Sequence, residues 1–338
     1  MNVAVCFNCV PPHLAQGQAA DRISEEGAED EAQAVADALR DLGHRPSLVA
    51  LGDDIAPFIA ELRKLRPEVV FNLCEGFWGQ SRKEMHVVAL LDLLGLTFTG
   101  AAPLCLGLTQ DKARTKDLLT RHQLPTPKYQ MVRVGEHYPR IEDLTYPLFV
   151  KPRFEDASLG ISNDSVVENE RELKSRIDYV HRTYCQGALI EEFIEGRELN
   201  VSIIGAGPWE VLPLSEIRFH PDLARAIVSY EGKWLEQSQG YQGTQPVCPA
   251  TLKGRDELLV RDAALRAVKL LECRDYARVD IRLRNGVPYI LEVNANPDIS
   301  PGAGLARSAG VAGMTYSRLI QRILEMAVQR KEPLRACA

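Results

Sequence analysis

The sequence predicts a mixed fold, with a doubly wound α/β domain at the N-terminus followed by two α+β lobes. Over the first hundred residues, short apolar segments alternate with segments whose apolar residues recur at helical spacing. Beyond residue 108 this regular alternation stops, and strands, helices and long polar segments follow in irregular order. A chain of 338 residues is long enough to give each of these three units its own hydrophobic core.

The first predicted domain covers residues 1–108. The run Val69–Leu73 is typical of a parallel strand that is covered on both faces. Residues 28–42 carry one apolar stripe and stop at Gly43, as an amphipathic helix does. We therefore expect a sheet whose strand-to-helix loops face the functional site. The expected strands are 3–7, 47–51, 69–73 and 97–99, and the expected helices are 28–42, 55–65 and 84–94.

Two further lobes are predicted, a central one over residues 109–190 and a C-terminal one over residues 191–338. The C-terminal lobe contains a long polar segment, residues 218–247, with glycines at positions 232, 240 and 243. Glycines give a backbone conformational freedom, so we expect this segment to form a lid loop. The other expected elements are helices 111–122, 169–183 and 256–271, a terminal helix from Tyr316, and strands 148–151, 188–194, 198–204 and 209–214.

Bulk composition argues against several classes of protein. With 40 basic and 46 acidic residues the net charge is −6, which argues against a nucleic-acid binder. No apolar run approaches the roughly eighteen residues of a membrane span, and the N-terminus lacks the charged region of a signal peptide. The eight cysteines are scattered, which indicates reduced thiols and predicts a cytoplasmic protein. Cys6 and Cys9 have no second cysteine or histidine pair, so we interpret them as strand positions rather than a zinc site.

A predicted hairpin near the C-terminus has one apolar and one polar face. Asn285-Gly286 is a strong hairpin signal, and strand side chains alternate between the two faces. The apolar positions are Val279, Ile281, Leu283, Tyr289, Leu291 and Val293, and the polar positions include Arg278, Asp280, Arg282, Glu292 and Asn294. We expect a three-residue loop, Arg284–Gly286, whose glycine sits in a left-handed bulge and brings all the polar positions onto one face.

Asp280, Glu292 and Asn294 are then expected to converge, with Arg278 beside them. Two carboxylates and an amide oxygen form a hard ligand set that suits Mg²⁺. A carboxylate at the end of a buried strand is costly unless it is paired, so the predicted partner of Glu292 is a metal ion that also binds phosphates. The competing interpretation is an ordinary half-exposed hairpin with a charged outer face.

Three further segments carry charged residues that suit a phosphorylated ligand. Lys151 ends an apolar strand, where a buried ammonium group needs an anion. Lys112 lies in the first turn of a predicted helix, where anions are favoured. The segment Glu191–Glu198 joins two predicted strands and suits an adenine edge and ribose hydroxyls. Each segment also has a plainer interpretation, because surface lysines and solvated turns show the same patterns.

Taken in order along the chain, these segments resemble those of the ATP-grasp ligases, and most closely the D-alanine–D-alanine ligases. The resemblance covers nearly the whole chain and implies an ATP-grasp fold in which the two α+β lobes clasp ATP. The segments that carry it are VFNLCEGFWG (70–79), DKARTK (111–116), PLFVKP (147–152), EEFIEGRELNVSIIG (191–205), ARVDI (277–281), LEVNANP (291–297) and AGVAGMTYSRLIQRIL (309–324).

Carried over position by position, the resemblance implies ATP and two Mg²⁺ ions, with Mn²⁺ as a substitute. The implied ATP-binding residues are Lys112 and Lys151 at the α- and β-phosphates, Lys233 of the lid at the γ-phosphate, Glu191 and Ile194 at adenine, and Glu198 at ribose. The implied metal ligands are Asp280, Glu292 and Asn294. The implied catalytic residues are Lys233 and Arg278, of which Arg278 would stabilise the acyl phosphate and the oxyanion that follows.

Several positions depart from the pattern of D-alanine–D-alanine ligases. The serine that follows the phosphate lysine by six positions is Ala157 here, with Ser158 next. The tyrosine after the lid lysine is Trp234, and the glycine after the Asn-x-x-Pro turn is Asp298. The serine that receives the C-terminal carboxylate falls near Ala303-Gly304. The ATP half of the pattern therefore matches, and the amino-acid half does not.

The N-terminal Gly-Gly of that family, with its amine-binding glutamate, is also absent, and Glu25 or Glu26 is the candidate substitute. Asp298 suits an amino group or a cation on the substrate, although capping a turn is an equal interpretation. The candidate substrate-binding residues are Glu25, Glu26, Ser158, Trp234 and Asp298.

The predicted function is an ATP-dependent carboxylate–amine ligase that forms an amide or peptide bond through an acyl phosphate and releases ADP and phosphate. Its expected substrates are small amino acids or peptide-like molecules other than two D-alanines. One alternative is D-alanine–D-alanine ligase of cell-wall synthesis, and another is a catalytically silent ATP-binding scaffold, against which the complete metal set argues. The resemblance also allows a homodimer through the first domain.

Overall fold

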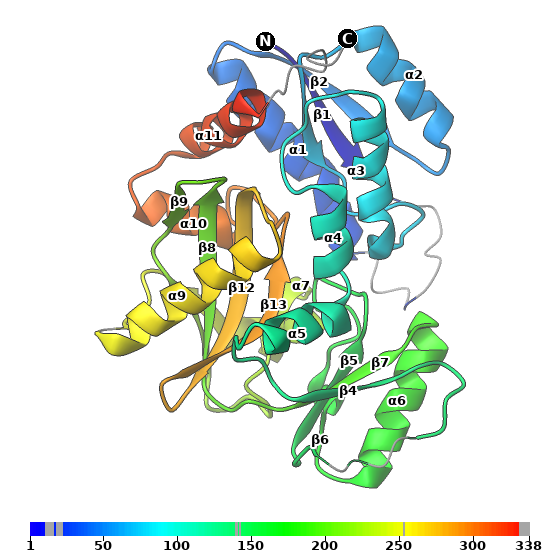
Figure 1. Ribbon diagram of the computed structural model, residues 1–338, viewed down its shortest axis with the longest axis vertical. Helices are drawn as coiled ribbons and strands as arrows, with labels where there is room; N and C mark the ends of the chain where they lie inside the picture. The colour runs from blue at the N-terminus through cyan, green and yellow to red at the C-terminus, as the bar shows by residue number, and fades with distance from the viewer. Residues whose placement is uncertain (11–16, 18–22, 139–140, 142, 253, 331–338) are drawn as a thin grey trace.

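Three β-sheets form the framework of the protein in a computed structural model, which describes residues 1–10, 17, 23–138, 141, 143–252 and 254–330, without the side chains of 23–26. The first sheet lies at the top of Figure 1, with the third sheet below it on the left and the second sheet below it on the right. The predicted mixture of an α/β unit with α+β units is confirmed.

The first sheet is parallel, in the order β2-β1-β3. Helix α1 packs on one face of it, and α2 and α3 pack on the other. The expected fourth strand at 97–99 is wrong, because this segment forms only a single bridge between Val70 and Phe98, and the helix α4 was not expected. The elements are β1 (Asn2–Asn8), β2 (Arg45–Leu51), β3 (Val69–Leu73), α1 (Ile23–Asp41), α2 (Ile55–Leu65), α3 (Glu84–Leu93) and α4 (Pro103–Thr109).

The second sheet is antiparallel, in the order β4-β7-β5-β6, and helix α6 covers its apolar face. Strand β7 runs on to Glu192 and so passes the predicted lobe boundary at residue 190. The elements are β4 (Tyr129–Val132), β5 (Leu148–Pro152), β6 (Val166–Val167), β7 (Ala188–Glu192) and α6 (Glu170–Tyr184), with α5 (Lys112–Arg121) leading into them.

The third sheet has the order β11-β10-β8-β12-β13, with β9 paired to β8. The expected lid segment 218–247 contains two short helices, and helix α10 was not expected. The elements are β8 (Arg197–Gly205), β9 (Trp209–Val211), β10 (Ser215–Phe219), α7 (Tyr230–Trp234), α8 (Gln239–Gln242), β11 (Thr244–Val247), α9 (Arg255–Leu270), β12 (Asp275–Arg284), β13 (Val287–Asn294), α10 (Gly304–Val311) and α11 (Tyr316–Gln329). Among the described helices, none is both long and apolar enough to cross a membrane.

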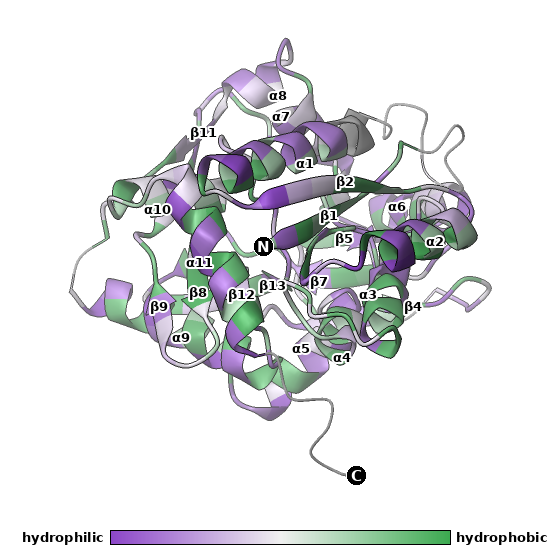
Figure 2. Cartoon of the chain, turned by 90° about the horizontal axis from the view of Figure 1, so that it is seen from above, coloured by the Kyte–Doolittle hydropathy of each residue, from purple (hydrophilic) through white to green (hydrophobic). Residues whose placement is uncertain are grey.

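Helix α11 joins the first and third sheets through one apolar core. Its buried residues Leu319 and Ile323 belong to the same cluster as Val5 of β1 and Tyr276 of β12. Both α1 and α11 mix polar and apolar residues around the helix, as Figure 2 shows, so each has an apolar side to bury. The C-terminal helix therefore holds the N-terminal sheet against the rest of the chain. The division into domains at residues 108 and 190 stays a prediction.

The β12–β13 hairpin brings the predicted polar positions together by a route that differs from the expected one. Its turn has two residues, Asn285 and Gly286, both with positive φ, and not three. The bulge lies instead at Leu291, between the pairs Asp280–Glu292 and Ile281–Ile290. The predicted apolar face is consequently wrong for the part of β13 that precedes the bulge. There the fully buried side chain is Ile290, whereas Tyr289 pairs with Arg282 on the polar face and Leu291 lines the cavity described below.

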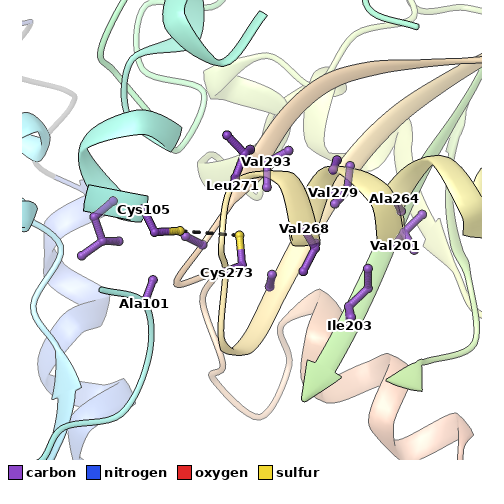
Figure 3. Close-up of a cluster of buried hydrophobic side chains, with 14 of the residues drawn as sticks. Ala101, Cys105, Val201, Ile203, Ala264, Val268, Leu271, Cys273, Val279 and Val293 are labelled. Atoms are coloured by element: carbon purple, nitrogen blue, oxygen red, sulfur yellow. Dashed lines mark hydrogen bonds between the residues drawn. The ribbon is translucent and has the colours of Figure 1, made fainter. Parts of the chain in front are cut away.

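A large apolar core fills the space between α4, α9 and the third sheet (Figure 3). In it, Cys105 Sγ of α4 lies 3.7 Å from Cys273 Sγ, and both are free thiols. Val268 of α9 and Val279 of β12 belong to the same core. This core anchors the chain that leads into the functional site.

Candidate active site

A cavity of about 1020 Å³ lies between the second and third sheets, and the lid segment 218–247 also lines it. The predicted residues in its wall are Lys112, Lys151, Ser158, Glu191, Ile194, Glu198, Lys233, Trp234, Arg278, Asp280, Glu292 and Asp298. Asn294 contacts two of these carboxylates. The side chains of Glu25 and Glu26 lie outside the described part of the structure. Folding thus gathers residues that are nearly two hundred positions apart in the sequence.

Asp280 and Glu292 are directly paired across β12 and β13, and they lie on one face of the hairpin, as the alternation predicts. Asp280 Oδ1 accepts a hydrogen bond from Asn200 Nδ2 at 2.6 Å, and Asp280 Oδ2 accepts one from Asn294 Nδ2 at 3.2 Å. Asn294 Nδ2 also lies 3.5 Å from Glu292 Oε1. Asn200 was not predicted, because it reaches Asp280 from β8, a strand that is far away in sequence and adjacent only in the sheet.

This donor set fits a hard divalent cation. Two buried carboxylates side by side need positive charge, and the amide of Asn294 can turn its oxygen toward a cation as readily as its NH₂ group. Within the described residues, no group of three or more His, Cys, Asp and Glu side chains is placed to hold a metal. The amide oxygen and phosphate oxygens would therefore have to complete the coordination sphere.

The two carboxylates differ in how easily they ionise. Burial raises the pKa of Asp280, while the neighbouring Arg278 opposes this rise. Burial alone would also raise the pKa of Glu292. Three cations, Lys112, Lys151 and Arg278, lower it instead to about 2. The cavity therefore holds a permanent negative charge at Glu292, surrounded by positive groups.

Arg278 is engaged by one of the predicted metal ligands. Its Nε donates to Asp280 Oδ1 at 2.8 Å, and its Nη2 donates to Asp280 Oδ2 at 2.9 Å. This two-point geometry is the strong form of an arginine–carboxylate pair, and it raises the pKa of Arg278 despite burial. Both charges are thus compensated within the protein.

Glu191 lies between two lysines rather than at an open base-binding position. Lys151 Nζ is 2.9 Å from its Oε1, and Lys116 Nζ is 2.8 Å from its Oε2. Lys116 also donates to Thr126 Oγ1 at 2.8 Å, and burial lowers the pKa of this lysine to about 8. Lys116 was not predicted, although it follows Lys112 by four residues and so shares its helix face.

Lys112 has protein oxygens as its partners. Its Nζ donates to the carbonyl of Glu155 at 2.5 Å and to Asp156 Oδ1 at 2.8 Å. Both partners belong to the loop that follows β5. The lysine is buried, with 5% of its surface exposed, and it is charged because anionic oxygen surrounds it. Phosphate oxygens of a nucleotide could take the place of these protein oxygens around Lys112 Nζ.

Glu198 is paired with Arg282, a residue to which the sequence analysis assigned no role. Arg282 Nε and Nη2 both donate to Glu198 Oε2, at 2.9 and 2.5 Å. The same guanidinium donates to the carbonyl oxygen of Ile194 at 3.2 Å and to that of Ala226 at 2.5 Å. Arg282 therefore fixes Ile194 and Glu198, two of the three predicted nucleoside-binding residues, and ties them to the lid segment.

The lid segment is attached to the loop after β5. Trp234 Nε1 donates to the carbonyl of Ala157 at 2.9 Å, and the backbone N–H of Tyr230 donates to that of Ile161 at 2.9 Å. Ala157 and Ser158 both have positive φ, so this loop is held in a tight, unusual conformation. Burial, followed by the nearby Arg278, lowers the pKa of Lys233. Lys233 and Arg278 therefore bring two basic groups to the lining of one cavity.

Asp298 lies in the cavity wall and also caps a turn. Its Oδ1 accepts hydrogen bonds from the backbone N–H of Ser300 at 2.8 Å and from Ser300 Oγ at 2.6 Å. Behind it, Glu31 of α1 accepts a hydrogen bond from the N–H of Ile299 at 2.9 Å. Burial, and then the charge of Asp298, raises the pKa of Glu31 well above its usual range. The first domain therefore contributes an acidic residue that was not predicted.

A cavity between two α+β lobes, with lysines on one wall and a carboxylate hairpin on the other, is the arrangement of an ATP-grasp ligase, which forms carbon–nitrogen bonds at the expense of ATP. The crystal structure of D-alanine–D-alanine ligase from Bacillus anthracis complexed with ATP has the same fold, with a TM-score of 0.78 at 23% identity over 98% of each chain. The family model for the D-ala D-ala ligase C-terminus matches residues 118–325. The chain belongs to the D-alanine–D-alanine ligase family.

Relatives of nearly full length bear this out. The uncharacterized protein y4sG of Sinorhizobium fredii is 36% identical over 308 residues, which is 88% of each chain. The D-alanine–D-alanine ligase of Cupriavidus metallidurans is 31% identical over 85% of this chain and 86% of the relative. That of Pseudothermotoga lettingae is 29% identical over 86% and 91%. The predicted family and enzyme class are confirmed, and the substrate pair is a separate question.

Proposed function

We propose that the protein is an ATP-dependent ligase that activates a carboxylate as an acyl phosphate and joins it to an amine, with release of ADP and phosphate. The observation that carries this proposal is the meeting of Lys112 and Lys151 with Asp280 and Glu292 in one cavity. The lysines suit the phosphate oxygens of a nucleotide, and the carboxylates suit the metal ion bound to those phosphates. We further propose that Mg²⁺ binds at Asp280, Glu292 and Asn294.

The lysines match the demands of phosphoryl transfer, which needs neutralised charge rather than covalent help. Bound Mg²⁺ would supply charge neutralisation at phosphate oxygens. Lys112 and Lys151 are already buried against anionic oxygen, so on nucleotide binding they exchange protein partners for phosphate partners. Lys116 remains to compensate Glu191 once Lys151 turns to a phosphate. Because these lysines are already buried, binding the nucleotide does not require them to give up a shell of water.

The second half of the reaction needs an anion site and protection from water. Arg278 and Lys233 both line the cavity, Lys233 from the lid segment, and they suit an acyl phosphate and the oxyanion formed on amine attack. Water would hydrolyse the acyl phosphate, so a cover is required. The hydrogen bonds of Trp234 and Tyr230 to the loop after β5 support a covering role for the lid segment.

We propose a substrate pair other than two D-alanines, drawn from small amino acids or peptide-like molecules. Ala157, Trp234 and Asp298 each replace a residue typical of D-alanine–D-alanine ligases, and two of them contact each other across the cavity wall. Asp298 places a carboxyl group in the cavity wall, and Glu31 lies behind it, hydrogen-bonded to the N–H of Ile299. D-alanine–D-alanine ligation is the second candidate, which relatives carrying that name favour. Glu25 and Glu26 remain candidates for amine binding, and a homodimer remains a proposal.

The test is a screen of carboxylate and amine pairs for ADP production with Mg²⁺ and ATP. We expect an active pair that is not D-alanine alone. Glu292→Gln should lower the rate by roughly a hundredfold or more, because the charge that holds the metal is lost. The surface substitution Glu61→Gln is the matched control. Near-normal turnover in Glu292→Gln would overturn the metal assignment, and tight ATP binding without ADP release from any pair would support a silent scaffold.

A further inference from the structure

Glu84 is a buried carboxyl group that lies outside the cavity. It is the first residue of α3, and only 4% of its surface is exposed. Its Oε1 accepts a hydrogen bond from Asn296 Nδ2 at 3.0 Å, and its Oε2 accepts one from Gln110 Nε2 at 3.0 Å. None of the described ion pairs includes it. One carboxyl group therefore connects two amides from distant parts of the chain.

Each of these amides sits two residues away from a proposed nucleotide-binding or metal-binding group. Gln110 precedes Lys112 by two positions, and Asn296 follows Asn294 by two positions. Helices α3, α4 and α5 run in succession down the centre of Figure 1, from the first sheet toward the cavity. Glu84 thus joins the start of the lysine-bearing helix to the end of the metal-binding strand.

The amide of Asn296 is locked in one orientation. Its Oδ1 accepts a hydrogen bond from the backbone N–H of Ala101 at 2.9 Å, so its Nδ2 must point toward Glu84. A Cβ on Gly100 would lie 2.5 Å from the same Oδ1, which shows how closely the backbone approaches. Glu84 Oε1 must therefore act as an acceptor, and a proton on Glu84 would sit on Oε2, facing Gln110.

Gln110 can serve both protonation states of Glu84. Its Oε1 is buried and has no hydrogen-bond partner. In the present orientation, Nε2 donates to the carboxylate. If the amide turns over, Oε1 can accept the proton of the neutral acid, and the buried oxygen gains the partner that it lacks. The network therefore remains connected when Glu84 is neutral.

We propose that Glu84 is a positioning residue which, through Gln110 and Asn296, sets the separation between Lys112 and the carboxylates of the β12–β13 hairpin, and so controls affinity for the metal–nucleotide. The proposal rests on the proposed function of the cavity. Neither Glu84 nor its two partners contacts the nucleotide site directly. Their effect is on the relative placement of the two walls.

The surroundings of Glu84 favour its neutral form. Burial raises its pKa to about 8, Glu75 and Asp156 add to the rise, and the two amide hydrogen bonds oppose it. The charge of Glu84 contributes in turn to raising the pKa of Cys74, Cys105 and Tyr276, none of which is a cation at neutral pH. Ionisation above pH 8 therefore adds a negative charge that the two amide hydrogen bonds compensate only in part, and this shifts the alignment of the walls.

The test is calorimetric measurement of the Kd for Mg²⁺ and ADP, about one pH unit below and above the Glu84 pKa of about 8. The proteins are the wild type, Glu84→Gln and the surface control Glu61→Gln. We expect the wild type and the control to lose about tenfold more affinity with rising pH than Glu84→Gln does, which is the usual size of an outer-shell effect. Lys116 also titrates near 8, and because all three proteins retain it, its contribution cancels in the comparison.

Parallel pH profiles in the wild type and Glu84→Gln would overturn the proposal. Asn296→Leu provides a second test, because it breaks one arm of the network without changing any charge. We expect it to weaken Mg²⁺·ADP binding by about tenfold at neutral pH, and unchanged binding would also overturn the proposal. If the wild type binds no ADP at any pH, the proposed function fails together with this inference, whereas parallel profiles overturn this inference alone.

Discussion

Replacing Glu84 by glutamine should remove a pH dependence from the free energy of unfolding. Burial raises the pKa of Glu84 from its ordinary value of 4.5 to about 8. The folded protein thus keeps a proton that the unfolded chain releases above pH 4.5. The stability linked to this proton is present in full below pH 4.5 and is lost as the pH rises through 8. At about 1.4 kcal/mol per pH unit, that interval corresponds to at most ~5 kcal/mol.

The assay is urea unfolding, followed by the fluorescence of the three tryptophans, at pH values below, within and above this interval. We expect the stability of Glu84→Gln relative to the wild type to rise by several kcal/mol, up to ~5, from the lowest to the highest pH. Glu61→Gln on the surface of α2 should show no such trend. A difference between Glu84→Gln and the wild type that stays constant within about 0.5 kcal/mol would refute the reasoning, because a neutral and a charged Glu84 would then cost the fold the same.

Three further substitutions probe the framework of the site. Gly100→Ala should cost about 2–3 kcal/mol and lower the Tm, because φ is +87° and the new Cβ would lie 2.5 Å from an asparagine oxygen; an unchanged Tm would contradict this. Lys116→Met should lower the free energy of unfolding in urea by about 3 kcal/mol, because it leaves Glu191 with one lysine. Adding Glu191→Gln should recover part of this loss. Equal stabilities of the wild type, the single variant and the double variant would argue against the pairing. Trp234→Phe removes the hydrogen bond to Ala157, so proteolysis within 218–247 should be about fivefold faster, as expected for about 1 kcal/mol, and an equal rate would count against the attachment of the lid.

The hairpin shows why one part of the site was predictable. The expected three-residue loop was wrong, and so was the assumption of an unbroken β13. The turn in the structure is one residue shorter than expected. The bulge at Leu291 then adds one extra residue to β13. The two errors cancel beyond the bulge, so Asp280 and Glu292 still lie on the same face of the hairpin. Whether the two carboxylates share a face depends only on whether the extra residues in the turn and in the strand add up to an odd or an even number. The expected hairpin and the observed one give the same result.

The partners of the predicted residues were not predictable in the same way. Asn200 meets Asp280, Lys116 meets Glu191, and Arg282 meets Glu198, in each case because two elements that are separate in sequence become neighbours in space. Only Lys116 had a local signal, its helical spacing from Lys112. The others required knowledge of which strands pair, which alternation of polarity does not contain.

By itself, the sequence determined the types and most of the positions of the helices and strands, the shared face of the two hairpin carboxylates, and the family through motifs in fixed order. Only the tertiary structure decided which charge compensates which, how α11 joins the first and third sheets, and how Glu84 connects Gln110 with Asn296. The physical reason is that local periodicity records which side chains avoid water, whereas ion pairs and buried hydrogen bonds depend on distances that exist only once the sheets have packed.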